Sequence, residues 1–458
     1  MTGYALLIPE LLVLLAAFWA LFAEKLPGGD RGAAWLGAVA TLAAAVIVAV
    51  APLATTGGPF PRMLAFDGPA RLARIVMCML AAVWLLWTAG RGQGRVREAV
   101  SLALFALIGG MLVAEARELV TLILAIELAT MPAYVLIGYR RGDGKGLEGA
   151  LKYFLMSMLT TLIMLYGFSF LYGLTGTTRY SGMDLKGAGT LGVLAVLFAV
   201  VGLLSKLSAA PFHYWAPDAY EGATPWAVAF VSTVPKVAGA VAIVRLVSAI
   251  APGVPLAGTV LLVASVLSIV LGNLGALTQT DVRRMMAYSG VAHSGYLLLG
   301  VAALSIPGSA AAIFYALAYA IPSMGIMLIT AEEGSQVADF GGMAQRRPAT
   351  AWVTVIMLFS LIGIPPLVGF FGKLSVFTAA LQRGFTAVVV LAVVMSVVSA
   401  AYYLRIVRAM FFAEEPAGHL GVTRNGAAAT AIGVCVVAVV ALGLAAGPLL
   451  ASIGVVLR

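Results

Sequence analysis

Charged residues, cysteines and motifs for nucleotide or metal binding are scarce in this chain. Only 10% of its 458 residues are charged and 62% are hydrophobic, which excludes a soluble globular protein. Cys78 and Cys435 each stand alone in an apolar segment, so we expect no disulfide and no metal site. The sequence has no Walker loop, dinucleotide-binding glycine motif, CxxC cluster or haem-ligating histidine pair. Energy for any work therefore comes from another subunit or from an ion gradient.

What the chain has instead is a series of apolar segments about 20 residues long. This is the length of membrane-spanning helices and is too long for the strands of a membrane barrel. We predict an all-α polytopic membrane protein with about fourteen transmembrane helices. The spans are expected at 4–23, 33–54, 69–90, 99–115, 118–138, 150–174, 189–210, 224–249, 257–277, 283–304, 308–331, 350–381 (interrupted), 385–411 and 427–449.

Basic residues are distributed unevenly between the two sets of loops. Odd-numbered connections hold about fifteen lysines and arginines, whereas even-numbered connections and the C-terminus hold about eight. The positive-inside rule then places the odd loops in the cytoplasm and both termini on the outer (periplasmic) side of a bacterial inner (plasma) membrane. The net charge of +9 therefore reflects orientation in a lipid membrane, and we expect no nucleic acid partner.

Two segments interrupt the helical pattern. Prolines at 211 and 217 and Gly222 follow Lys206 closely, and Gly363-Ile-Pro-Pro366 precedes Lys373. Proline cannot donate to a helical ladder, and freed carbonyls at membrane depth are tolerated only inside protein or beside a wet cavity. One lysine precedes its break and the other follows its break, and this reversed order is typical of two inverted-topology repeats.

Four charged residues lie well inside the apolar spans: Glu127, Lys206, Lys236 and Lys373. Insertion scales penalise such a charge by about 2.5–3.5 kcal/mol, so each needs a function or a partner. Snorkelling and static helix-packing salt bridges are the structural alternatives. We interpret the three lysines as candidate proton carriers, and we expect a lysine on a neighbouring helix to pair with Glu127.

Other polar residues are more ambiguous. Lys152 is close enough to an interface to snorkel, and His293 is either a packed neutral side chain or a proton relay, since histidine titrates near physiological pH. Glu10 and Glu115 lie near span ends, where we expect them to be solvated. Arg245 lies near a helix end, and we expect it to be a snorkelling anchor.

Five motifs cover much of the chain: IELATMPAYVLIGYRR at 126–141, LEGALKYF at 147–154, LLSKLSAAPFHYWAPDAYEGATPWAVAFVSTVPKVA at 203–238, GNLGALTQTDVRRMMAYSGVAHSGYLLLG at 272–300 and GIPPLVGFFGKL at 363–374. Together with IPELLV at 8–13, they resemble subunit N of the proton-pumping NADH:quinone oxidoreductase, respiratory complex I. The resemblance extends over nearly the whole chain, and KLSAAPFHYWAPDAYEGATP is its most specific stretch.

The resemblance implies a single antiporter-like transmembrane domain over 1–458, with two inverted five-helix repeats and broken seventh and twelfth helices. It divides the chain into helices 1–3 at 1–97, a first repeat at 98–249, a second repeat at 257–411 and a last helix at 427–449. It also implies that six residues carry protons: Glu127, Lys152, Lys206, Lys236, His293 and Lys373. Pro322-Ser323 departs from the family pattern, which leaves the packing of the eleventh helix open.

The function implied by the resemblance is proton translocation in the membrane arm of complex I. The implied route passes from Lys236 through Lys206, under control of Glu127, to His293 and Lys373. No redox centre is expected in this chain, and FMN, iron–sulfur clusters and quinone are expected in partner subunits. The expected neighbours are subunit M, small subunits K and J and the lateral helix of subunit L. A stand-alone cation/proton antiporter, an antiporter-module subunit and a structural spacer remain alternatives, and the electron donor and the quinone stay open.

Overall fold

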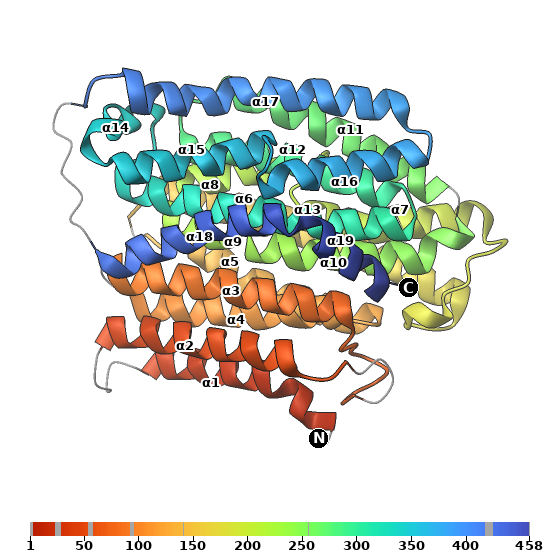
Figure 1. Ribbon diagram of the computed structural model, residues 1–458. Coiled ribbons are helices and arrows are strands. Elements are labelled where there is room, and N and C mark those ends of the chain that lie inside the picture. The colour runs from red at the N-terminus through yellow and green to blue at the C-terminus, as the bar shows by residue number, and fades with distance from the viewer. Residues whose placement is uncertain are drawn as a thin grey trace.

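Long helices lie side by side along one common direction in the computed structural model of the protein (Figure 1). The structure describes residues 3–22, 29–53, 58–91, 96–140, 142–254, 256–416 and 425–457. The N- and C-terminal ends lie at the same end of the bundle. This arrangement confirms the all-α polytopic fold predicted from the apolar segments.

The first six predicted spans are continuous helices. They are α1 Ile8–Phe22, α2 Gly29–Val50, α3 Gly68–Arg91, α4 Val96–Glu115, α5 Leu119–Ile137 and α6 Gly144–Thr175. The next five spans are α7 Gly189–Lys206 with α8 Trp215–Gly222, α9 Pro225–Val231 with α10 Val234–Ile250, α11 Leu256–Leu277, α12 Val282–Ala302 and α13 Ile306–Glu333. The last are α15 Pro348–Ile362 with α16 Val368–Gln382, α17 Thr386–Phe412 and α18 Gly426–Leu444 with α19 Ala446–Val456, while α14 Met343–Arg346 is one turn. Each of the fourteen predicted spans therefore has a helical counterpart.

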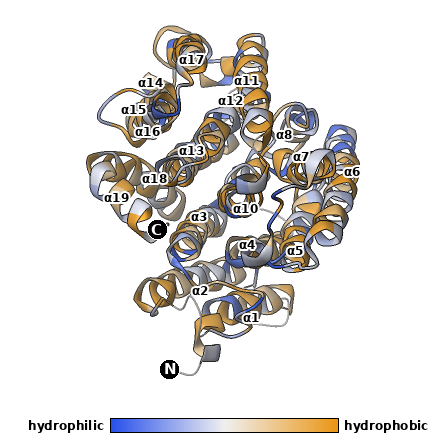
Figure 2. Cartoon of the chain, turned by 90° about the vertical axis from the view of Figure 1, so that its right-hand side faces the viewer, coloured by the Kyte–Doolittle hydropathy of each residue, from blue (hydrophilic) through white to orange (hydrophobic). Residues whose placement is uncertain are grey.

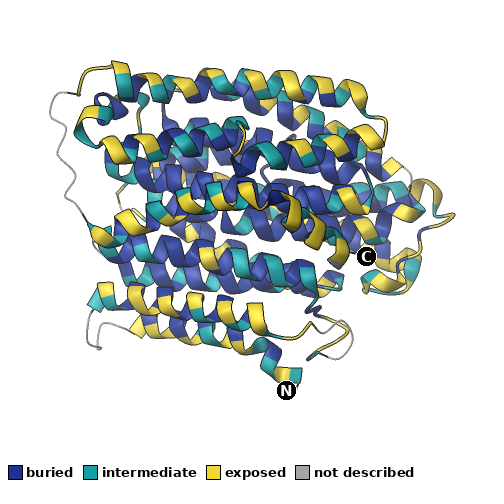
Figure 3. Cartoon of the chain, in the orientation of Figure 1, coloured by how far each residue is buried: buried dark blue, intermediate teal, exposed yellow. Residues whose placement is uncertain are grey.

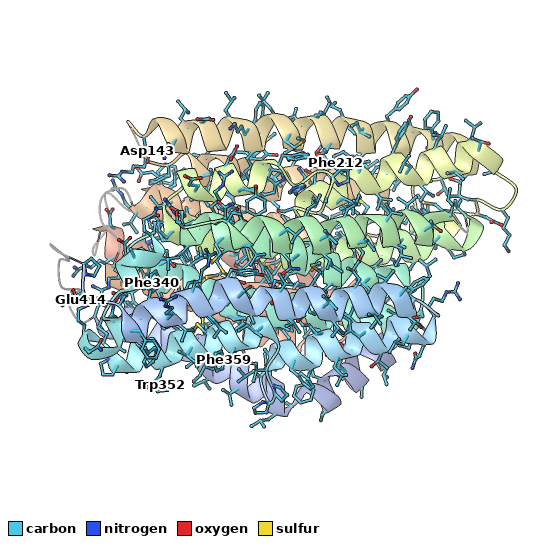
Figure 4. The ribbon with its side chains drawn as sticks, turned by 90° about the horizontal axis from the view of Figure 1, so that it is seen from above. Asp143, Phe212, Phe340, Trp352, Phe359 and Glu414 are labelled. Carbon is cyan, nitrogen blue, oxygen red and sulfur yellow. The ribbon has the colours of Figure 1, made fainter. Side chains whose placement is uncertain are left out.

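Both predicted interruptions are present, at mid-length of the bundle. Figure 4 shows Phe212, inside the first break, and Phe359, just before the second, well away from the helix ends, where Asp143 and Glu414 lie. Gly363 closes α15 in the left-handed region with φ +94°, a conformation that glycine adopts without a steric penalty. The breaks therefore expose backbone ends inside the bundle.

A third break, in the eighth span, was not predicted. α9 ends at Val231 and α10 begins at Val234, because Pro235 has no N–H to donate to the preceding turn. The hydroxyl of Thr233 donates to the carbonyl of Ala229 at 2.7 Å and so satisfies one freed acceptor. Lys236 follows this break directly.

The most buried helix is α13, which is enclosed along its whole apolar length. It packs against α12, α16, α9 and α10 and lies within the buried centre in Figure 3. Pro322 lies inside this helix without ending it, so the departure from the family motif leaves the eleventh span continuous. Large exposed hydrophobic side chains, by contrast, are frequent on α1, α2, α6 and α17, and hydrophobic residues line these outer helices in Figure 2. These outer surfaces are suited to lipid or to partner helices.

The expectation that Glu10 and Glu115 are solvated is wrong. Their exposed fractions are 6% and 0%, because Arg74 reaches from α3 to both carboxylates at 2.7 and 2.8 Å. Arg245 also differs from a free interfacial anchor, since it forms an ion pair with Asp67. Position near a span end did not indicate solvation, because neighbouring helices cover these sites.

Close backbone approach joins the first two helices of each predicted repeat. A Cβ on Gly109 of α4 would lie 2.2 Å from the backbone nitrogen of Ala129 on α5, and a Cβ on Gly272 of α11 would lie 2.4 Å from that of Ala292 on α12. Small residues allow this approach between membrane helices.

We therefore expect Gly109→Ala and Gly272→Ala each to destabilise the protein by about 1–3 kcal/mol through overpacking. The thermal unfolding midpoint in detergent measures the effect. Gly433→Ala in α18, where a Cβ meets no atom within 4 Å, is the matched control and should leave the midpoint unchanged. An equal midpoint in all three variants would show that the backbone contacts are not tight.

Candidate functional site

Lys206 is the last residue of α7, and its amine lies inside the first half of the bundle. The chain leaves the helix after it because Ser208 has a positive φ of 56° and Pro211 cannot extend a helical ladder. The Lys206 amine donates to the hydroxyl of Ser157 on α6. Ser157 also accepts a hydrogen bond of 2.6 Å from the hydroxyl of Tyr134 on α5. Three helices therefore meet at one buried amine.

Glu127 lies on α5 near this amine but does not contact it. One carboxylate oxygen accepts a hydrogen bond of 3.1 Å from Thr161 on α6, and the other is buried without a hydrogen-bond partner. Within the described part of the chain, no lysine nitrogen lies within 4.0 Å of Glu127, so the expected direct pair is wrong. Ser157 accepts the hydrogen bond from the Lys206 amine instead.

Lys236 points from α10 to α12. Its amine donates to the carbonyl of Gly290 at 2.9 Å and lies 4.8 Å from the ring centroid of Tyr319 on α13. A Cβ at residue 290 would lie 2.7 Å from the amine nitrogen, so only glycine leaves room for this contact. A carbonyl and a π-face are the groups that can hold a cation without a carboxylate.

Lys373 caps the first half of the twelfth span. Its amine, carried by α16, donates to the carbonyls of Leu361 and Ile362 at 3.0 and 2.7 Å and to the hydroxyl of Ser396 on α17 at 2.7 Å. The last carbonyls of a helix have no partner within the helix and carry partial negative charge. The broken end of α15 therefore supplies the acceptors that a buried ammonium needs.

His293 lies on α12, between Lys236 and Lys373. Its Nδ1 is 2.8 Å from the hydroxyl of Tyr315 on α13, and its Nε2 is 3.4 Å from the hydroxyl of Tyr403 on α17. The side chain is 5% exposed, and both ring nitrogens face groups that can donate or accept a proton. This geometry suits a relay as well as a packed neutral ring.

Short polar links join these groups. The hydroxyl of Ser294 lies within hydrogen-bond distance of two carbonyls, that of Leu207, the residue after Lys206, and that of Gly290, the acceptor of Lys236. Lys236 therefore lies between the first break and His293. At the other end, Lys373 lies 5.2 Å from the ring centroid of Tyr296.

Lys152 is not part of this buried line. Its amine is exposed on the N-terminal part of α6, and it pairs with Glu148 and Asp218 at 2.7 and 2.6 Å. Asp218 also binds Arg284 of α12, which binds Glu221 in turn. Burial opposes ionisation of Asp218, but hydrogen bonds from Lys152 and Arg284 outweigh it and lower its pKa below the ordinary value. This surface network joins α6 and α8 of the first half to α12 of the second.

Sequence reasoning missed the hydroxyl groups that hold the charged ones. Ser157 and Tyr134 lie within family motifs or beside them, but a serine or tyrosine in an apolar span carries no signal of its own. The sequence offered one hint of such hydroxyl groups, because some tyrosines, such as the pair Tyr402-Tyr403, lie one helical turn from a polar residue. In the described residues, no group of three or more His, Cys, Asp or Glu side chains could hold a metal ion.

Comparison with known proteins places this geometry among membrane subunits of respiratory enzymes. The family model described as NADH:quinone oxidoreductase/Mrp antiporter, TM, matches residues 116–399. NADH-quinone oxidoreductase subunit N from Acidithiobacillus ferrooxidans is 36% identical over 97% of this chain and 96% of its own length. A chain of respiratory complex I from Thermus thermophilus has 32% identity and a TM-score of 0.84, over 97% of this chain and 98% of that one. A chain of the archaeal membrane-bound sulfane sulfur reductase has a TM-score of 0.87 at 23% identity, covering 99% and 98%, and shares the fold alone.

Lys206 and Lys373, the lysines beside the breaks in the seventh and twelfth spans, have different surroundings. Their replacement is therefore expected to change the stability of the protein differently. Lys373→Met leaves the carbonyl of Leu361 without this donor, whereas Ile362 keeps a hydrogen bond of 3.2 Å from Ser396. Loss of the donor costs about 1–3 kcal/mol. Lys206→Met removes a buried ammonium and its desolvation cost, and Ser157 keeps its hydrogen bond from Tyr134. We expect the thermal unfolding midpoint to fall in the first variant and to hold or rise in the second. Equal losses in both variants would contradict the capping role.

Proposed function

Because this chain belongs to the family of NADH-quinone oxidoreductase subunit N, the antiporter-like membrane subunits of complex I, we propose that it translocates protons through its line of buried titratable side chains. The observation that carries the proposal is the placement of two lysines at mid-membrane helix breaks, with a third lysine and a histidine between them. Ionisable groups at this depth mark ion pathways by default. The redox chemistry that drives them belongs to other subunits.

The contacts favour a definite order along the line. We propose that a proton passes from Lys206 to Lys236, then to His293 and finally to Lys373. The supporting links are the Ser294 hydroxyl, which bridges the backbone next to Lys206 and the acceptor of Lys236, and the position of His293 beside it. This order replaces the one implied by the resemblance, in which Lys236 comes before Lys206.

Glu127 is proposed as the switch of the first step. A carboxylate that acts through space favours the charged form of a buried amine, and loss of that interaction favours release of its proton. Glu127 and Lys206 are not in direct contact, so the interaction between their charges can be adjusted. A small movement of α5 against α7 changes the distance between the two groups. A proton moved against 100 mV costs about 2.3 kcal/mol, which is within the reach of one charge interaction in a poorly polarisable site.

Lys152 is proposed as a surface residue of the uptake side. Its network with Asp218 and Arg284 joins the two halves of the protein and lies beside α8. We further propose that 98–249 and 257–411 are inverted repeats, as the reversed order of lysine and break suggests. The excess of basic residues in odd loops supports a bacterial inner membrane location with both termini outside.

The proposed partners are those of the family's enzyme. Subunits M, K and J and the lateral helix of subunit L would contact the exposed apolar faces of the outer helices, with lipids covering the rest. FMN, iron–sulfur clusters and quinone would lie in partner subunits, since titratable groups alone cannot transfer electrons. The proposed chemistry of this chain is proton binding, transfer and release.

Removal of either member of the first step should slow the enzyme as a whole. In the assembled complex, we expect Lys206→Met and Glu127→Gln to lower quinone-dependent turnover and proton pumping together, because a positioned proton-transfer group typically contributes about a hundredfold or more to its step. Quinone reduction and the pH change inside vesicles are measured side by side. Lys145→Met, an exposed lysine on the same helix as Lys152, is the control. Full pumping in both site variants would refute the proposal.

Replacement of His293 separates relay from packing. His293→Gln keeps groups that can hydrogen-bond to Tyr315 and Tyr403 but removes the titrating ring, so we expect pumping to fall while the complex still assembles. Tyr315→Phe removes one hydrogen bond and leaves the ring, and a much smaller loss is expected. If the His293→Gln variant pumps normally, the histidine is a packed neutral residue.

A further inference from the structure

A cluster of three buried charged residues lies outside the line of lysines, in the N-terminal helices. The Nη2 atom of Arg74 on α3 lies 2.7 and 2.9 Å from the two carboxylate oxygens of Glu10 on α1. Its Nε atom lies 2.8 Å from Glu115, the last residue of α4. Arg74 and Glu115 are 3% and 0% exposed. One guanidinium therefore serves two carboxylates from two other helices.

The second carboxylate is incompletely satisfied. Glu115 is fully enclosed, and its Oε2 atom accepts no hydrogen bond. Glu10 and Glu115 contact neighbouring nitrogens of one guanidinium, Nη2 and Nε, which brings the two carboxyl groups next to each other. Two ionised carboxylates in this position repel each other and cannot hydrogen-bond, because neither carries a proton to donate. The geometry therefore fits one carboxylate and one carboxylic acid better than two carboxylates.

The surroundings do not supply a second positive charge. Arg245 of α10 donates to the carbonyl of Ala114 at 2.9 Å, but its charge is matched by Asp67. Arg71 turns to the carbonyl of Ala51. The Cys78 thiol, one turn after Arg74, faces the sulfur of Met111. With both glutamates ionised, the cluster would carry a net charge of −1 in an enclosed site, and burial of an unpaired charge costs several kcal/mol.

We propose that Glu10 and Glu115, both bound to the guanidinium of Arg74, share one proton between their carboxyl groups. This cluster is then a proton-binding site separate from the proposed translocation line. The bound proton fills the gap between the two carboxyl groups and makes the cluster neutral. Two carboxyl groups that share a site release their protons in separate steps. Glu10 lies in the first turn of α1 and Glu115 ends α4. The site is therefore near the end of the bundle that holds the N-terminus (Figure 1), and a proton would reach it from that face.

Infrared spectroscopy of the assembled complex tests the proposal, because a neutral carboxylic acid has a carbonyl band that a carboxylate lacks. Spectra of the wild type, Glu115→Gln and Glu10→Gln are compared at neutral pH in light and heavy water. We expect each single substitution to remove the same one-proton band, since the remaining glutamate then pairs with Arg74 as a carboxylate. Two independent variants keep the test available if one of them does not assemble.

Glu118→Gln is the matched control, because Glu118 lies three residues from Glu115 and accepts hydrogen bonds from Thr121 and Thr178. The control should keep the band. If neither Glu10→Gln nor Glu115→Gln loses the carbonyl band of the carboxylic acid, both glutamates are ionised and the proposal is overturned. The readout does not depend on proton pumping, so failure here leaves the proposed function untouched, and the reverse also holds.

Discussion

The structure depends on one requirement: an ammonium group inside a membrane protein needs oxygen acceptors, and continuous helices offer few of them. Every carbonyl in the interior of an α-helix already accepts a bond from its own chain. The broken end of α15 releases carbonyls of Leu361 and Ile362, and these hold Lys373. The break in the twelfth span is therefore a means by which buried positive charge is tolerated, rather than a defect in the span.

The same requirement explains why the lysines differ. Lys373 has three oxygen acceptors, Lys236 has one carbonyl and an aromatic face, and Lys206 has one hydroxyl. The lysine with the weakest set of contacts lies nearest to the Glu127 carboxylate. An amine with a single hydrogen bond is the most responsive to movement of a nearby charge. The buried helix α13, which packs against α9, α10, α12 and α16, frames the other groups.

Much of the fold could be predicted because the membrane imposes a simple pattern on sequence. Apolar length located the fourteen spans, and Pro211 and Gly363 located two breaks. The break before Lys236 was missed, since a proline near the start of a span also suits a helix beginning. Burial of Glu10 and Glu115 was missed as well, because closeness to a span end does not reveal which neighbouring helix covers it.

The sequence by itself determined which charges lie in the apolar spans, where the helices cannot continue and which family the chain resembles. These properties are local, and hydropathy and backbone chemistry suffice to read them. Tertiary structure alone decided the partners: Ser157 rather than Glu127 for Lys206, the surface network for Lys152, and the shared guanidinium of Arg74. Partners come from helices far apart in the chain, and their choice depends on how close packing orients each helix face.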